Sequence, residues 1–329
     1  MKSPWQGRPV LVTGAGGFIG SHLAERLCEL GARVRALVHY NALGSRGWLD
    51  HSPLTQKMEV VAGDVTDQDF VRNVVGSTEV VFHLAALVGI PYSYTAPASY
   101  VKTNISGTLN VLQAARASGC SRVVHTSTSE TYGTARYVPI DEEHPLQAQS
   151  PYAASKVAAD KLAESFHLSF GLPLVTVRPF NTFGPRQSAR AVIPTIIQQC
   201  LAGGPVRLGS LTPTRDMNYV KDTVAGFVCA GAAEGVVGET INLGTGREVS
   251  IGDLAAKIAE LTGSMAGVVI EEVRVRPPKS EVQRLCSSND KAKRLLGWSP
   301  SHSLDEGLAA TIDWMRQNPT LANAGSYTV

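Results

Sequence analysis

The sequence predicts an α/β fold, a doubly wound parallel sheet joined to a smaller α/β C-terminal lobe. Two observations predict it. Short β-branched runs alternate with longer segments whose apolar residues recur at helical spacing, which is typical of βαβ units. The predicted strands are also nearly continuous in apolar residues, as expected of strands that helices cover on both faces.

The first half of the chain supplies the sheet. Its helices are predicted over residues 19–30, along an apolar stripe from 101 to 115, and over 151–170. Ser150 would cap the last of these helices and Pro151 would occupy its first position. Strands are predicted at residues 10–13, 34–38, 59–61, 80–84, 122–127 and 174–177.

The second half has a different character. Glycine and proline become frequent between residues 181 and 213, which indicates loops and a smaller, irregular lobe. We therefore divide the chain into a sheet domain, residues 1–180, and a second lobe, residues 181–329. Residues 219–246 are expected to return to the sheet domain. Further helices are predicted near residues 193–201, 220–233, 251–261 and 304–317.

The composition narrows the class of function. The 329 residues are 43% hydrophobic and 18% charged, so the chain can bury a sizeable core. Basic residues exceed acidic ones by 30 − 28 = +2, which argues against nucleic-acid or polybasic membrane partners. The five cysteines are widely spaced without a CxxC, so neither a disulfide framework nor a metal site is predicted. Without a signal peptide or a membrane-length apolar segment, the expected location is the cytoplasm.

A glycine-rich turn joins the first strand to the first helix. Gly14, Gly17 and Gly20 form a GxxGxxG pattern, with Phe18 and Ile19 between the last two glycines. The first glycine permits the tight turn, the second lets the backbone approach a pyrophosphate, and the third lets helix and strand pack closely. Because a helix N-terminus presents unpaired N–H groups, the turn predicts a dinucleotide site of the Rossmann type, for NAD or NADP.

The end of the second strand should face the adenosine ribose. An acidic residue is usual there, but this chain has His39 and Asn41, either of which can serve a ribose hydroxyl. Arg35 and Arg46 lie nearby and are compatible with a 2′-phosphate, which slightly favours NADP. After the third strand, Asp64 and its neighbour Val65 would suit the adenine edge, although Asp64 is equally suited to capping a turn.

A tyrosine and a lysine supply candidate catalytic groups. Tyr152 and Lys156 are four residues apart, so on a helix they share one face. A neighbouring ammonium and a nicotinamide cation would favour the phenolate, which makes Tyr152 a usable base at neutral pH. The preceding strand ends in a Ser/Thr-rich segment, residues 126–131, that can hydrogen-bond a substrate hydroxyl.

On these motifs the chain resembles the NAD(P)-dependent nucleotide-sugar epimerase/dehydratase family of the extended short-chain dehydrogenases/reductases. The resemblance covers essentially the whole chain. It implies a Rossmann lobe, a C-terminal lobe for the nucleotide sugar, and a homodimer. It also implies that Leu84, Ala85 and Ala86 contact the cofactor. Further matching segments are residues 83–86, Asn104, residues 178–186, 215–216, 219–222, 242–244, 276–277 and 296–298.

Within this family, residues 128–130 are the informative triplet. The resemblance implies that Tyr152 is the base at the carbon-4 hydroxyl, that Thr128 is its hydrogen-bond partner and that Lys156 holds the ribose. Family 4,6-dehydratases carry a glutamate at the position of Glu130, which removes the carbon-5 proton and assists water loss. Ser129 departs from the dTDP-glucose type, which has aspartate there. The sequence of steps is redox-neutral, so the cofactor can stay tightly bound.

Several segments are also similar to N-acetylglucosamine nucleotide 4,6-dehydratases of the legionaminic acid pathway. These are residues 39–41, 181–194 and 213–216. The similarity favours UDP- or GDP-N-acetylglucosamine as the substrate. The expected substrate-binding residues, by family position or because arginine suits phosphate geometry, are Asn181, Arg186, Arg190, Arg215 and Arg276.

Other activities remain open at this point. The Thr-Ser-Glu triplet also occurs in UDP-glucuronate decarboxylases, so it does not separate dehydration from decarboxylation. A 4-epimerase or a 5,6-dehydratase would use the same scaffold, although Glu130 speaks against a plain epimerase. A non-catalytic NADP-binding sensor is the alternative from a different class, and it would not need Tyr152, Lys156 and Glu130 together.

Overall fold

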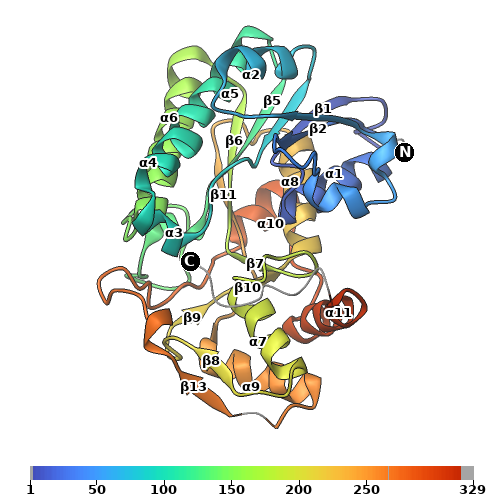
Figure 1. Cartoon of the computed structure of the whole chain (residues 1–329). Helices are drawn as coiled ribbons and strands as arrows, with labels where there is room; N and C mark the ends of the chain where they lie inside the picture. Colours follow the sequence, from blue (N-terminus) through green and yellow to red (C-terminus); the bar gives the residue numbers. More distant parts are fainter. Residues whose placement is uncertain (1–2, 266, 320–329) are drawn as a thin grey trace.

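The computed structural model describes residues 3–265 and 267–319 and shows two lobes (Figure 1). A seven-stranded sheet forms the first lobe, with strand order β11-β6-β5-β4-β1-β2-β3 and parallel pairing throughout. This architecture confirms the predicted fold class. The strands are β1 (Pro9–Thr13), β2 (Arg33–His39), β3 (Glu59–Gly63), β4 (Val80–His83), β5 (Arg122–Thr126), β6 (Leu174–Pro179) and β11 (Thr240–Leu243).

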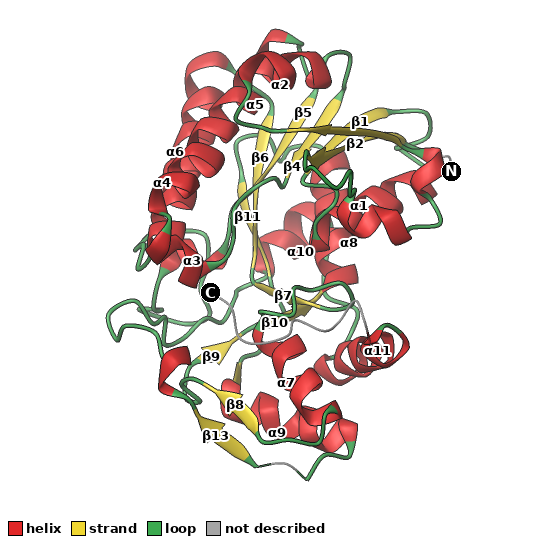
Figure 2. Cartoon of the chain, in the orientation of Figure 1, coloured by secondary structure: helices red, strands yellow, loops and turns green. Residues whose placement is uncertain are grey.

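Helices cover both faces of the sheet (Figures 1 and 2). One face packs under α1 (Phe18–Glu29) and α8 (Val220–Ala232), and the other under α2 (Gln68–Val75), α5 (Gly107–Ala117) and α6 (Pro151–Phe170). The apolar cluster on the α1 and α8 side continues into the second lobe, so the two lobes share one core. No helix among the described residues has the length and hydropathy needed to cross a membrane.

The second lobe is built from short ribbons and helices. Its strands pair two by two: β7 (Asn181–Phe183) with β10 (Met217–Tyr219), β8 (Val206–Leu208) with β13 (Val268–Ile270), and β9 (Thr214–Arg215) with β12 (Val249–Ser250). Only the last pair is antiparallel. Its helices are α7 (Val192–Leu201), α9 (Ile251–Thr262) and α11 (Leu304–Gln317), whereas α10 (Asp290–Leu296) packs against β11 and α8 of the sheet lobe (Figure 1).

Helix α6 carries the tyrosine and lysine singled out in the sequence. Ser150 caps it by accepting a hydrogen bond from the Ala153 N–H at 3.1 Å, Pro151 is its first residue, and Gly171 ends it in the left-handed conformation. The predicted helix over 151–170 is therefore confirmed. Tyr152, Lys156 and other buried residues at a spacing of four turn one face of this helix toward the sheet.

The helix predicted along the stripe from 101 to 115 is less regular than expected. Two short helices, α3 (Ile90–Thr95) and α4 (Pro97–Tyr100), lead into a π-helical segment, Val101–Ser106, before α5 begins at Gly107. Asn104 lies in that segment. Its amide accepts from the Leu87 N–H at 2.8 Å and donates to the Leu87 carbonyl, which ties the segment to the chain after β4.

Candidate active site

The turn between β1 and α1 has the shape that a dinucleotide diphosphate requires. Gly14 has φ = 71°, and a Cβ there would lie 2.9 Å from the Ala85 backbone nitrogen. Gly17 caps α1 without any side-chain hydrogen bond, and the first turn of α1 carries no acidic residue. The helix N-terminus thus keeps its positive partial charge close to a glycine backbone, which suits the pyrophosphate of NAD. Gly20, Phe18 and Ile19 lie in that first turn, as the predicted cradle requires.

A buried histidine fixes the ends of two strands beside this turn. His83 Nε2 lies 3.0 Å from the hydroxyl of Thr108, which itself donates to the Asn104 carbonyl. His83 Nε2 is therefore the donor, and His83 Nδ1 accepts from the Thr13 hydroxyl at 2.9 Å. Burial lowers the pKa of His83 well below its ordinary value, so the ring is neutral. The Thr13 oxygen in turn accepts the N–H groups of Leu84 and Ala85, which places this backbone against Gly14.

The end of β2 differs from the sequence expectation for the ribose site. The Asn41 amide is used within its own loop: its oxygen accepts the N–H groups of Leu43 and Ser45, and its nitrogen donates to two carbonyls. Arg35 binds Glu59 at 2.9 Å and the Val74 carbonyl at 2.8 Å, so it is not free to meet a 2′-phosphate. Of the two arginines that slightly favoured NADP, Arg35 is therefore already bound within the protein. Arg46 is exposed, and so is His39.

Asp64 caps a turn, which was the alternative to a contact with adenine. Its carboxylate accepts the Thr66 N–H at 2.8 Å, which is an Asx turn after β3. Val65 is buried, and its carbonyl accepts a hydrogen bond from the Asn110 amide. A contact of either residue with adenine stays a prediction.

Tyr152 and Lys156 are both buried at the carboxyl end of β5. Burial raises the pKa of Tyr152, a hydrogen bond with Thr128 opposes that rise, and the charges of Glu130 and Asp160 add to it. The Lys156 ammonium donates to the Thr126 carbonyl at 2.6 Å. The sequence predicted that Lys156 would lower the Tyr152 pKa. Among the described residues, Lys156 is not one of the groups that shift this pKa. Instead, the hydrogen bond with the Thr128 hydroxyl lowers the pKa of Tyr152.

Glu130, just after the end of β5, is the third candidate catalytic residue. The short 3-10 turn Ser129–Tyr132 follows β5, and the Thr128 side chain accepts the Glu130 N–H at 3.3 Å. Glu130 is 9% exposed, and its charge acts on both Tyr152 and Arg215. One buried carboxylate therefore acts electrostatically on both the candidate base and an arginine of the second lobe. Ser129 is also buried in this turn.

Two arginines of the second lobe meet at one carboxylate. Arg215, in β9, donates to Glu281 at 3.1 Å, and Arg276 approaches the same carboxylate oxygen at 3.4 Å. Burial lowers the pKa of Arg215, whereas Glu130 and Glu281 raise it. The predicted substrate residues Arg215 and Arg276 are thus brought together next to Glu130. Asn181 follows β6, and its side-chain oxygen is buried without a hydrogen-bond partner among residues 3–265 and 267–319.

The other two predicted substrate arginines lie elsewhere. Arg186 forms a two-pronged ion pair with Glu25 of α1, with both N–O distances 3.0 Å, and also donates to Ser21. It has φ = 71°, a left-handed conformation that is unusual for a residue with a side chain. Its guanidinium therefore fastens the 184–190 loop to α1, which explains its place apart from Glu130. Arg190 is exposed in the same loop.

Sequence reasoning missed several side chains that support the candidate site. The Tyr100 ring packs edge-on against Tyr152, with ring centroids 6.2 Å apart. Asp160 is buried one turn after Lys156 and binds His125, Ser127 and Arg178. The spacing of four between Lys156 and Asp160 on a predicted helix was an available signal, because it puts opposite charges on one face.

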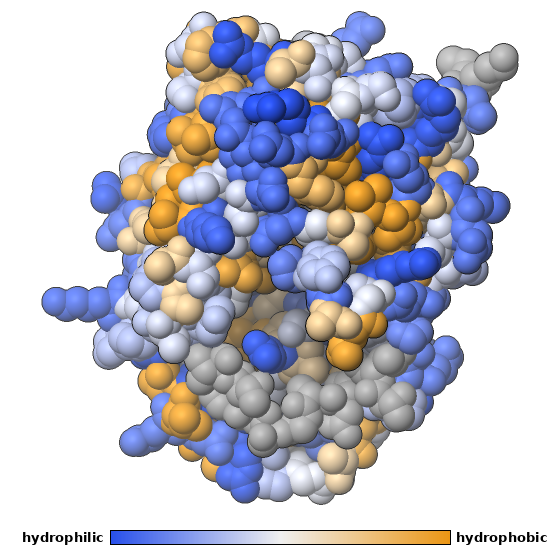
Figure 3. Space-filling model, turned by 45° about the horizontal axis from the view of Figure 1, so that its top comes forward, coloured by the Kyte–Doolittle hydropathy of each residue, from blue (hydrophilic) through white to orange (hydrophobic). Residues whose placement is uncertain are grey.

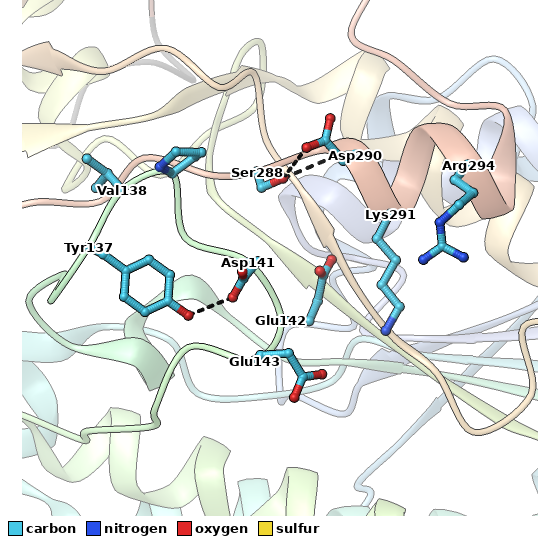
Figure 4. Close-up of a pocket in the computed structure, with 10 residues that line it drawn as sticks. Tyr137, Val138, Asp141, Glu142, Glu143, Ser288, Asp290, Lys291 and Arg294 are labelled. Atoms are coloured by element: carbon cyan, nitrogen blue, oxygen red, sulfur yellow. Dashed lines mark hydrogen bonds between the residues drawn. The ribbon is translucent and has the colours of Figure 1, made fainter.

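A separate surface cavity of about 520 Å³ lies between the 137–143 loop and α10 (Figure 4). Tyr137 donates to Asp141 at 2.7 Å, and Glu142 accepts the Asn242 N–H at 2.7 Å. Lys291 of α10 pairs with Glu239. The catalytic candidates do not line this cavity, so its volume alone does not mark the active site.

Comparison with known proteins identifies the class. A family model described as GDP-mannose 4,6 dehydratase matches residues 11–311. The UDP-glucose 4-epimerase of Mycolicibacterium smegmatis is 35% identical over 93% of this chain and 98% of its own. The dTDP-glucose 4,6-dehydratase of Streptomyces antibioticus is 34% identical over 94% and 92%, respectively. Among solved structures, the dTDP-glucose 4,6-dehydratase DesIV of Streptomyces venezuelae, with NAD bound, has a TM-score of 0.87 at 30% identity, covering 94% of this chain and 97% of that one.

The chain therefore belongs to the NAD-dependent nucleotide-sugar epimerase/dehydratase family of extended short-chain dehydrogenases/reductases. The matched relatives include both an epimerase and dehydratases at nearly equal identity. Membership thus defines the class of enzyme and of substrate, and the reaction has to be argued from the site.

Proposed function

We propose that this enzyme is an NAD-dependent nucleotide-sugar 4,6-dehydratase acting on UDP- or GDP-N-acetylglucosamine. The observation that carries the proposal is the place of Glu130, a buried carboxylate whose charge acts on both Tyr152 and Arg215. A plain 4-epimerase needs a base at the carbon-4 hydroxyl only. A dehydratase needs a second group for the carbon-5 proton, and we assign that role to Glu130, a carboxylate whose charge acts on the candidate base.

The proposed chemistry begins at the carbon-4 hydroxyl. Tyr152 is protonated without cofactor, and the positive charge of a bound nicotinamide would favour its phenolate, which then removes the hydroxyl proton. Thr128 hydrogen-bonds the reacting oxygens, and Lys156 holds the cofactor ribose. Bound NAD would supply the redox step, taking hydride from carbon 4 and returning it to carbon 6. The 4-ketone acidifies the proton on carbon 5, which Glu130 removes. Glu130 then gives that proton to the carbon-6 hydroxyl, which leaves as water. Once carbon 6 has received hydride, carbon 5 takes up a proton that comes from solvent, and Tyr152 returns its proton to solvent.

The substrate would span the two lobes. Arg215 and Arg276 can hold the diphosphate, because arginine matches phosphate oxygens with two parallel N–H donors. Their common partner Glu281 would then be free to accept from ribose hydroxyls. We keep Asn181 as a contact to phosphate or sugar. Its orphaned side-chain oxygen needs a donor, which a sugar hydroxyl can supply, and its amide nitrogen can donate to a phosphate. Arg186 is left out, since Glu25 occupies its guanidinium.

NAD is the cofactor that we propose. The similar DesIV structure holds NAD, and Arg35 is committed to Glu59 and the Val74 carbonyl. The sugar and its nucleotide are proposed from the sequence alone, on the resemblance of residues 39–41, 181–194 and 213–216 to N-acetylglucosamine nucleotide dehydratases, and the relatives reported above do not decide the sugar. A homodimer, a cytoplasmic location and the domain division at residue 180 also remain predictions.

The second candidate is 4-epimerisation, which the similarity to the Mycolicibacterium smegmatis enzyme favours. To separate the two, we would incubate the purified protein in D₂O with UDP- and with GDP-N-acetylglucosamine, without added cofactor, and follow products by mass spectrometry and NMR. The proposal predicts loss of one water, a 4-keto-6-deoxy sugar and deuterium at carbon 5. Isomerisation without water loss would replace it with the epimerase. If neither UDP- nor GDP-N-acetylglucosamine is converted, the protein is incubated with UDP-glucuronate. Release of carbon dioxide from this substrate would then indicate a decarboxylase.

A further inference from the structure

A buried acid lies directly behind the candidate catalytic pair. Asp160 of α6 is 5% exposed, and its carboxylate accepts three hydrogen bonds. They come from His125 Nε2 at 3.0 Å, from the Ser127 hydroxyl at 2.5 Å and from Arg178 Nη2 at 3.0 Å. The donors lie on β5, just after β5 and on β6, so the acid ties α6 to the end of β5, which precedes Glu130, and to the end of β6.

The network continues to the turn that carries Glu130. Arg178 also donates to the Tyr132 hydroxyl at 2.8 Å, and its guanidinium carbon lies 4.7 Å from the Tyr132 ring centre. Tyr132 donates in turn to Asn242 of β11 at 2.8 Å. Because Tyr132 ends the Ser129–Tyr132 turn, Asp160 and Arg178 fix that turn relative to α6.

Asp160 also sets the charge around Lys156. Burial lowers the pKa of Lys156 to about 8, and Asp160 opposes this shift. Burial alone would raise the pKa of Asp160, but the His125 hydrogen bond and the charges of Arg178 and Lys156 hold it well below its ordinary value. Asp160 is therefore ionised at neutral pH.

Among residues 3–265 and 267–319, Asp160 is the one anion whose charge acts on Lys156, while the Glu130 carboxylate acts on Tyr152. His83 on β4 and His125 on β5 have pKa values that burial lowers, so both rings are neutral. Arg178 on β6 is a cation. Burial raises the pKa of Tyr152, so that phenol is protonated.

We infer that Asp160, buried one helical turn after Lys156 on the same face of α6, is a positioning residue for the redox step: its carboxylate lies beside the lysine, and through Arg178 and Tyr132 it holds the Glu130 turn relative to α6. This inference rests on the Tyr152 and Lys156 roles of the proposed function, but not on the fate of the sugar after carbon 4 is oxidised. Stability alone is a weak reason for such a group, since apolar residues often replace a buried ion pair without loss.

The direct test is the protonation of Lys156. The protein is labelled with lysine carrying ¹³C at the ε carbon, and each Cε signal is titrated by NMR, with Lys156→Arg assigning the signal. In Asp160→Asn, the Lys156 midpoint should fall by about one pH unit or more, as expected on losing an adjacent opposite charge. The matched control is Glu164→Gln, an exposed carboxylate one turn further along α6 that pairs with Lys161, and it should leave the midpoint in place.

An unchanged Lys156 midpoint in Asp160→Asn would overturn the inference. If the buried Arg178, left unpaired, prevents that variant from folding, the double variant Asp160→Asn/Arg178→Gln removes both charges and answers the same question. Its Lys156 midpoint should also fall, and a wild-type midpoint would again contradict the inference. Because these titrations need no substrate, their outcome is independent of whether the enzyme dehydrates.

A second measurement concerns activity on whichever nucleotide sugar the wild type converts. Asp160 raises the pKa of both Lys156 and Tyr152. Removing it lowers both, so the pH profile of kcat/KM in Asp160→Asn should move as a whole toward lower pH. A loss of activity that is equal at every pH would show a merely structural role and would count against the inference.

Discussion

The two lobes hold their charged groups in different ways. In the sheet lobe, Lys156, Asp160 and Arg178 are nearly inaccessible, and strand ends and buried hydroxyls fix them. In the second lobe, Arg215 and Arg276 meet Glu281 from a two-residue strand and a loop, and Arg276 keeps 29% of its side chain exposed. In the proposed function, the reaction chemistry thus sits on groups that strand ends fix, and nucleotide recognition on arginines from a short strand and a loop. Figure 3 shows a hollow in the surface on the side where the lobes meet.

The largest expected effect lies in the sheet lobe. Tyr152→Phe removes the candidate base and keeps the ring against Tyr100, so turnover should fall about 10²- to 10⁴-fold with little change in thermal stability. Product formation and the melting temperature are measured together. Tyr137→Phe, which changes an exposed tyrosine bound to Asp141, is the control and should keep full activity. Activity of Tyr152→Phe within tenfold of wild type would remove Tyr152 from the reaction.

The second lobe should respond in binding. Arg215→Met deletes the buried guanidinium next to Glu281, and KM should rise about tenfold to a hundredfold, since hydrogen bonds to charged groups contribute ~1.5–3 kcal/mol. The change in kcat should be smaller, because diphosphate contacts are made equally in ground state and transition state. Steady-state kinetics of Arg215→Met and of the exposed Arg207→Met decide this. Equal KM values for the two variants would separate Arg215 from the substrate.

The smallest effect is expected where the two lobes are fastened together. Arg186→Met breaks the ion pair with Glu25, so the free energy of unfolding should fall by about 1–3 kcal/mol while KM stays within about twofold. Denaturant unfolding and kinetics on the same preparation test both statements. The opposite pattern, a raised KM at unchanged stability, would restore Arg186 as a substrate residue.

The sequence predicted the sheet lobe well for a physical reason. Its strands and helices follow from local periodicity, and the glycine turn and the Ser150 cap of α6 follow from backbone chemistry at single positions. Tyr152 and Lys156 were found because four residues on a helix are one turn in space. By the same rule, Asp160 lies on the same face of the helix as Tyr152 and Lys156. Its partners His125 and Arg178 come from strands, and only the structure shows that they bind it.

The second lobe was harder to predict, because long-range contacts decide the role of each arginine there. Residues 186 and 215 read alike in the sequence, as arginines in glycine- and proline-rich segments. The first turns toward α1 because Glu25 lies there, and the second turns toward Glu130 and Glu281. Likewise, Asn41 offered a ribose contact in the sequence, yet its amide closes its own loop. Such choices depend on partners distant in the chain, which no local pattern encodes.

The central claim is that Glu130 makes this scaffold a dehydratase, and Glu130→Gln tests it most directly. The glutamine keeps the shape of the side chain but cannot remove the carbon-5 proton. In a single turnover with the substrate that the wild type dehydrates, absorbance at 340 nm and the mass of the sugar are followed together. The account predicts that reduced cofactor accumulates while water loss slows about 10²- to 10⁴-fold. Water loss at the wild-type rate would contradict it.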